Sequence, residues 1–178
     1  GFIEAAPHQA LLPSLTAYKV DLKAFTQDFY GNICNGRIDP VKATLKRLKE
    51  NGIWFEIVNL MIPTLNDNMD DIKRMANWVA TELSPDVPIH FTRFHPMYKL
   101  RNLPRTPPAT LAAARETAMQ EGCKFVYTGN LPGNEGEHTY CPLCKKVVIK
   151  RYGHMVIENR LNDGACPDCT CAIPGVWA

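Results

Sequence analysis

The region from Cys141 to the end of the 178-residue chain holds five of the seven cysteines, and four of these form two Cys-Pro-X-Cys pairs separated by 21 residues. A disulfide-stabilised protein spreads its cysteines along the chain and folds in an oxidising compartment. Paired CxxC segments instead indicate a metal site in a reducing compartment, because four thiolates suit a tetrahedral ion such as zinc or iron. The predicted ligands are Cys141, Cys144, Cys166 and Cys169.

The segment between the two pairs contains two short β-like runs, Val147–Ile149 and Met155–Ile157, on either side of Gly153. A hairpin here would return the second pair to the first, as in a zinc ribbon or a rubredoxin. We expect zinc in a single ribbon attached to an enzyme, although four-thiolate geometry also permits iron. Cys171 lies too close to Cys169 to be an obvious fifth ligand, so we interpret it as a spare thiol.

Residues 1–130 repeat a different pattern, in which a short apolar run rich in β-formers precedes a segment of helical period. The runs recur about every 35 residues, which is the spacing of successive β–α units rather than of hairpins. Near-continuous apolar runs are typical of parallel strands covered on both faces. We therefore predict an α/β domain over residues 1–130 and a small four-cysteine β subdomain over residues 131–178. The predicted strands are Ala17–Leu22, Trp54–Ile62, Ile89–Phe94 and Lys124–Thr128.

Capping residues predict where the helices between these strands begin. Asp39 is an N-cap followed by a proline, the residue favoured at the first helical position. Asn66 or Asp67 can cap the next helix, and Thr106 opens a third. A shorter helical turn is expected over Phe25–Tyr30.

The composition excludes several classes of protein. With 46% hydrophobic and 21% charged residues the chain is not a disordered one. No run approaches the roughly 18 apolar residues of a membrane span, and the first residues lack the basic region of a signal peptide, so we expect a cytoplasmic protein without a membrane partner. A net charge of +2 is too small to favour nucleic acid. The small basic excess lies after Cys141, where we interpret it as a solvated hairpin face.

Polar residues follow two of the predicted strands. Asp21 and Lys23 stand two apart at the end of the first strand, so their side chains point the same way in an extended backbone. His95 follows the third strand, and α/β folds bind ligands at the carboxyl ends of parallel strands. A carboxylate beside an ammonium group suits a zwitterionic amino-acid moiety, although a surface ion pair is the simpler interpretation of these two residues alone. Asn59, and Pro63–Asp67 just after the second strand, complete the same edge of the sheet, although we favour their interpretation as ordinary turn and capping residues.

The chain carries, in order, the segments DLKAFTQDFY, LMIPTLNDN, TRFHP, YTGNLPGNEGEHTYCPLC and the terminal CPDC and IPGVW. In combination these segments resemble the AmmeMemoRadiSam-system radical SAM proteins, which are relatives of the pyruvate formate-lyase activating enzyme. The resemblance runs along essentially the whole chain and is more specific than any one segment.

The resemblance implies the C-terminal half of a partial (β/α)6 radical SAM barrel, followed by a zinc-ribbon-like or rubredoxin-like β subdomain. Such proteins bind a 4Fe–4S cluster and S-adenosylmethionine, and they make a 5′-deoxyadenosyl radical that abstracts a hydrogen atom from a substrate. Asp21 and Lys23 match the family's DLK motif near the S-adenosylmethionine. His95 matches its late-strand histidine, and Leu60 is similar to a strand residue that lines the same pocket.

One departure from the family stands out. The cluster ligands of these proteins form a CxxxCxxC loop, which this sequence lacks, and Cys34 is isolated. We therefore expect a part of a radical SAM oxidoreductase or activase that is inactive by itself. A rubredoxin-like electron-transfer module and a zinc-ribbon binding module are the alternatives.

A half barrel would leave the edge of its first strand unpaired. We expect this edge to be covered by the missing N-terminal half, by another chain or by the segment Phe2–Leu15, or else to cause oligomerisation. The other AmmeMemoRadiSam-system proteins are further expected partners.

Overall fold

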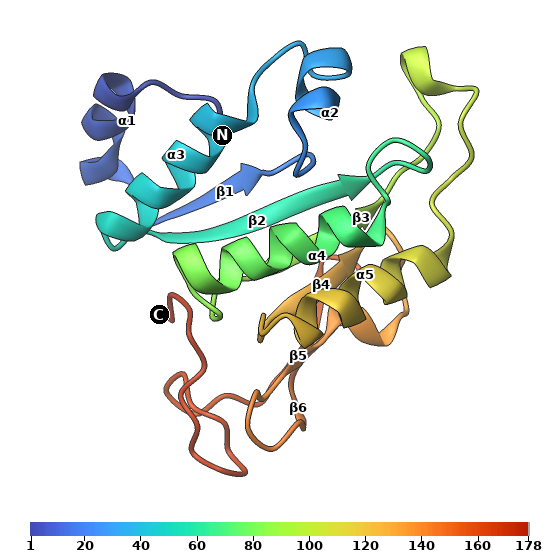
Figure 1. Ribbon diagram of the computed structural model, residues 1–178. Helices are drawn as coiled ribbons and strands as arrows, with labels where there is room; N and C mark the ends of the chain where they lie inside the picture. Colours follow the sequence, from blue (N-terminus) through green and yellow to red (C-terminus); the bar gives the residue numbers. More distant parts are fainter. Residues whose placement is uncertain (178) are drawn as a thin grey trace.

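Four parallel strands form the main sheet of the computed structural model, which describes residues 1–177 (Figure 1). The strands lie side by side in chain order, and each begins and ends within two residues of a predicted strand. Parallel neighbours joined by helices confirm the prediction of an α/β fold. The strands are β1 (Ala17–Asp21), β2 (Trp54–Met61), β3 (Ile89–Arg93) and β4 (Val126–Gly129).

Three long helices cover one face of this sheet (Figure 1). Leu45, Met75 and Leu111, one from each helix, are fully buried in a single core. The same core contains Phe55, Ile57 and Met61 of β2. This core uses the apolar stripes that are visible in the sequence. The helices are α3 (Ile38–Glu50), α4 (Met69–Trp78), which continues as the π-helical turn η2 (Val79–Leu83), and α5 (Pro108–Gln120).

The opposite face of the sheet, here called the open face, is only half buried. The expectation that both faces are covered alike is therefore wrong, because β2 alternates buried with half-buried residues along its whole length. The register places Lys19 beside Glu56, and His90 beside Tyr127. Besides these four residues, the open face carries Asp21, Trp54, Val58, Leu60 and Thr92.

The predicted helices exist, but they begin a few residues from the expected positions. α3 begins one residue before Asp39 and has Arg37 as its N-cap, and α5 begins one residue later than predicted. α4 is capped by Asn68, whose side chain accepts hydrogen bonds from two backbone amides, because Asn66 is engaged in the preceding loop. The short helical turn is observed as α2 (Gln27–Asn32).

β1 pairs with β2 on one side only and is an edge strand among the described residues. The chain before it forms α1 (Ala5–Leu11) and the turn η1 (Leu12–Ser14), which together bury His8 and Leu12. The expected pairing of this edge with further strands stays a prediction.

A second, antiparallel sheet consists of β5 (Thr139–Tyr140), β6 (Val147–Tyr152) and β7 (Met155–Asn159). β6 and β7 form the predicted hairpin, which turns at Gly153 with a positive φ of 58°. Val148 and Ile149 of β6 are buried against Phe125, which directly precedes β4. The second sheet thus joins the first at β4; the domain boundary after residue 130 stays a prediction.

Two short turns, η3 (Tyr98–Leu100) and η4 (Glu135–Glu137), complete the described elements. No helix in the described part of the chain is long and apolar enough to cross a lipid bilayer.

Candidate metal centre and ligand-binding rim

The four predicted metal ligands come together beside the second sheet. All four Sγ atoms lie within 4.8 Å of one another, with Cys141 3.4 Å from Cys169 and Cys144 3.7 Å from Cys166. At a metal–sulfur distance of about 2.3 Å, the sulfurs of a tetrahedral site are separated by about 3.8 Å. The four cysteines therefore form a group that can hold one metal ion.

The two Cys-Pro-X-Cys segments adopt the same backbone conformation. In the first, the amide of Lys145 donates to the carbonyl oxygen of Cys141 at 3.0 Å, and Lys145 has φ 63°. In the second, the amide of Thr170 donates to the carbonyl oxygen of Cys166 at 2.9 Å, and Thr170 has φ 58°. The two sulfurs of each turn face the two sulfurs of the other turn. The Cys-Pro-X-Cys spacing therefore places both cysteines of a pair at one site.

The paired cysteines differ in how readily they ionise, and ion pairs hold the two cysteine turns together. A backbone hydrogen bond from Cys171 favours the thiolate of Cys169, but burial and hydrogen bonds with the neighbouring sulfurs raise its pKa to about 12. Burial opposes ionisation of Cys141, yet hydrogen bonds from the backbone amides of Cys144 and Leu143 lower its pKa to about 6. Asp168, between the two cysteines of the second pair, forms ion pairs with Lys146 at 2.7 Å and with Arg160 at 3.1 Å. These pairs tie the second cysteine turn to both ends of the hairpin.

At the carboxyl end of β1 the predicted pair of charges is present. Lys23 Nζ lies 2.7 Å from Asp21 Oδ2, and both side chains are partly exposed. The two side chains thus point the same way, as their spacing predicted. The arrangement presents one acceptor and one donor at the rim of the sheet.

Asn59 and Asn66, which the sequence analysis favoured as turn and capping residues, hold the backbone of this rim. Asn59 is fully buried and donates through Nδ2 to the carbonyl oxygens of Leu22 at 2.8 Å and Lys23 at 3.2 Å. Asn66 donates to the same Lys23 oxygen at 2.6 Å. In addition, the Tyr30 hydroxyl accepts from the amide of Lys23 at 3.1 Å. The interpretation as turn and capping residues missed this role, because these hydrogen bonds join residues that are far apart in the sequence.

Leu60 and His95 lie at the ends of β2 and β3. Leu60 is half buried on the open face and packs against a small cluster that includes Phe94. His95 is exposed in the loop after β3. Thr106 fixes the start of this loop, since its Oγ1 accepts from the amide of Phe94 at 2.9 Å and donates to the carbonyl oxygen of Met61 at 2.6 Å. The participation of Asp21, Lys23, Leu60 and His95 in one binding site stays a prediction.

No family model matches the chain. It is 47% identical over 152 residues to the uncharacterized protein MJ0808 of Methanocaldococcus jannaschii. The match covers 85% of this chain and 45% of that relative, so the chain spans less than half of the relative's length.

Among solved structures, a domain of a pyruvate-formate lyase-activating enzyme from Bacteroides vulgatus is similar, with a TM-score of 0.62. The chain shares the fold of that domain. The superposition covers 71% of this chain and 75% of the domain, at 14% sequence identity. This likeness agrees with the activating-enzyme-like fold that the sequence predicted.

Proposed function

We propose that this chain is the S-adenosylmethionine-binding portion of a radical enzyme of the activating-enzyme type. The observation that carries the proposal is the set of polar groups at the carboxyl ends of parallel strands in a fold shared with an activating-enzyme domain. Ligands of such sheets bind at that edge. We also propose that the chain forms half of a (β/α)6 barrel and that it is one of the AmmeMemoRadiSam-system proteins.

The residues at this rim suit the methionyl end of the cofactor. Lys23 would hold its carboxylate and Asp21 its ammonium group, while Leu60 would contact its apolar part and His95 would close the site from the loop after β3. Asn59 and Asn66 act indirectly, because they fix the backbone that carries Lys23. Bound to a 4Fe–4S cluster, S-adenosylmethionine supplies a 5′-deoxyadenosyl radical for hydrogen abstraction from the substrate.

The cysteines of this chain do not fit the ligand set of such a cluster. Apart from the four grouped sulfurs, Cys34 is exposed after α2, Cys123 is buried beneath α4, and Cys171 lies next to the second pair. We propose that the cluster ligands lie in a further part of a longer protein, which also pairs with the edge of β1. In this proposal the chain alone does not cleave S-adenosylmethionine.

For the four-cysteine group we propose a structural zinc ion, which would lock the two turns to the hairpin. Iron at the same site would instead make a rubredoxin-like redox centre, and four thiolates permit either metal. Elemental analysis of the purified chain, together with an optical spectrum, distinguishes them. One zinc per chain without colour supports the structural role, whereas one iron with thiolate charge-transfer bands makes electron transfer the leading function.

The radical chemistry is tested in the longer Methanocaldococcus jannaschii relative, reconstituted anaerobically with iron, sulfide and dithionite. We expect 5′-deoxyadenosine to form from S-adenosylmethionine. Alanine at the positions aligned with Asp21 or His95 should reduce its formation at least about tenfold, the loss expected for one charge-assisted contact. The position aligned with Asp86, an exposed partner of Lys124, is the control. Unchanged 5′-deoxyadenosine formation in the Asp21 and His95 variants would refute the assignment.

A further inference from the structure

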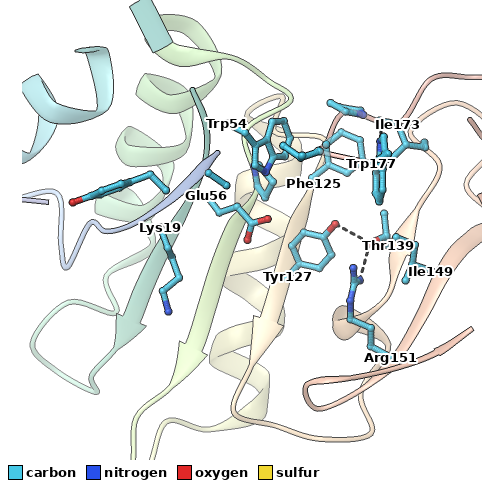
Figure 2. Close-up of a pocket in the computed structure, with 16 residues that line it drawn as sticks. Lys19, Trp54, Glu56, Phe125, Tyr127, Thr139, Ile149, Arg151, Ile173 and Trp177 are labelled. Carbon is cyan, nitrogen blue, oxygen red and sulfur yellow. Dashed lines mark hydrogen bonds between the residues drawn. The ribbon is translucent and has the colours of Figure 1, made fainter. Parts of the chain in front are cut away.

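A cavity of about 480 Å³ lies on the open face, between the two sheets (Figure 2). It sits at the amino-terminal end of the strands, because Trp54 begins β2, whereas the rim described above lies at the opposite end. Leu60 follows Trp54 by six residues, which corresponds to about 20 Å along a strand. The cavity is therefore a second site. Its apolar walls are formed by Trp54, Phe125, Ile149, Ile173 and Trp177.

One side of the cavity carries a fixed negative charge. Glu56 Oε2 lies 2.8 Å from Nε2 of His90, and the His90 ring stacks on Tyr127 with 4.9 Å between centroids. The hydrogen bond from His90 lowers the pKa of Glu56, so this half-buried carboxyl group is ionised at neutral pH. Glu56 lines the cavity, and a hydrogen bond with the neighbouring Trp54 side chain also lowers its pKa. Lys19, its neighbour on β1, points away from it (Figure 2).

The other side carries a fixed positive charge that comes from the second sheet. Arg151 of β6 donates through Nη1 to Thr139 Oγ1 at 2.8 Å, and its guanidinium group lies 5.7 Å from the Tyr127 ring centre. The Tyr127 hydroxyl is itself bonded to Thr139 at 2.9 Å. Tyr127 stands between Glu56 and Arg151, and no ion pair joins these two charges among the described residues (Figure 2).

Glu56 is bonded to His90 and Arg151 to Thr139, so neither of these opposite charges is paired with the other across the cavity. A ligand that carries both charges satisfies them together, and apolar walls favour an apolar body. We propose that this cavity binds a free α-amino acid with an aromatic side chain. Its ammonium group lies on Glu56, its carboxylate on Arg151 and its ring among Trp54, Phe125 and Trp177. The proposal stands independently of S-adenosylmethionine chemistry at the rim.

The test titrates the metal-loaded chain with three probes of one size: L-phenylalanine, phenethylamine, which lacks the carboxylate, and 3-phenylpropionate, which lacks the ammonium group. Trp54 and Trp177 line the cavity, so tryptophan fluorescence and calorimetry both serve as readouts. We expect saturable binding of L-phenylalanine, with each singly charged probe at least about tenfold weaker, since each loses one charge-assisted hydrogen bond. No saturable binding of L-phenylalanine up to about 10 mM, or equal binding of a singly charged probe, would overturn the proposal.

Variants assign the two charges separately. Glu56→Gln should weaken L-phenylalanine and phenethylamine about tenfold and leave 3-phenylpropionate unchanged, whereas Arg151→Gln should weaken L-phenylalanine and 3-phenylpropionate and leave phenethylamine unchanged. Lys46→Ala, which removes an exposed ion pair with Glu82, is the matched control and should bind like the parent. If both charge variants bind all three probes as the parent does, the assignment fails. The probe series on the parent protein decides the ligand class even where a variant does not fold.

Discussion

Asn66 donates a 2.6 Å hydrogen bond from its side-chain amide to the backbone carbonyl oxygen of Lys23, 43 residues earlier in the chain. The same side chain donates to the carbonyl oxygen of Leu60 at 2.9 Å and accepts from the amide of Ile62 at 2.6 Å. One buried asparagine thus connects the end of β2 to the turn after β1. The position of Lys23 at the proposed cofactor rim therefore depends on a residue that has no direct contact with the ligand.

Replacing Asn66 should lower the free energy of unfolding more than replacing an ordinary loop residue would. Asn66→Ala removes three hydrogen bonds to backbone groups, and only the Lys23 carbonyl oxygen keeps another side-chain partner, Asn59, so we expect a loss of about 2–4 kcal/mol in the free energy of unfolding. Asn68→Ala is the matched control, because Asn68 only caps α4 and should cost about 1 kcal/mol. Urea denaturation of both variants measures the difference. Equal midpoints for the two variants would show that Asn66 does not hold the rim.

Removal of a metal ligand should be distinguishable from removal of the neighbouring spare thiol. Cys144→Ser should abolish stoichiometric metal binding and lower Tm by at least about 10 °C, because the hairpin and the two cysteine turns enclose few other contacts. Cys171→Ser should keep one metal per chain, since Cys171 is outside the group of four sulfurs. Elemental analysis and thermal unfolding of both variants give the answer. Loss of the metal in Cys171→Ser would make that residue a ligand.

The sequence was sufficient to predict features that depend on local patterns. The strands follow from apolar runs, the four sulfurs from the spacing of two pairs, and the Asp21–Lys23 pair from alternation in an extended backbone. α4 begins later than predicted because Asn66, one of its candidate caps, is engaged in other hydrogen bonds. The cavity was not predictable from the sequence, since Glu56 and Arg151 come from different sheets and only the docking of β6 near β4 brings them to one space.

Acidification should destabilise the protein through His8 in the amino-terminal helix. Burial, and then the charge of Arg47, lower the pKa of His8, whose side chain is fully buried between α1 and α3. Below the unfolded value of about 6.5 the unfolded chain binds a proton that the folded chain resists, so stability is lost as the pH falls through this range. His8→Gln should flatten this dependence. His154→Gln, at the exposed hairpin turn, should leave it intact.

Unfolding free energies of the parent and both variants at pH 7.5 and pH 5.5 test this prediction. The parent and His154→Gln should lose stability between the two values by the same amount, and His8→Gln should lose less. A pH dependence that is identical in all three proteins would assign the effect to groups other than His8.

The wall of the cavity should be sensitive to a methyl group at one glycine. Gly164 has φ 75°, and a Cβ there would lie 2.6 Å from the Trp177 ring, whereas Gly153 has φ 58° with no atom within 4 Å of a Cβ. Alanine at either position costs about 1–2 kcal/mol of backbone strain. Gly164→Ala must also displace Trp177, which we expect to add about 1–3 kcal/mol and to shift the tryptophan emission. Urea denaturation followed by fluorescence measures both effects, and equal costs for the two variants would place Trp177 away from Gly164 in solution.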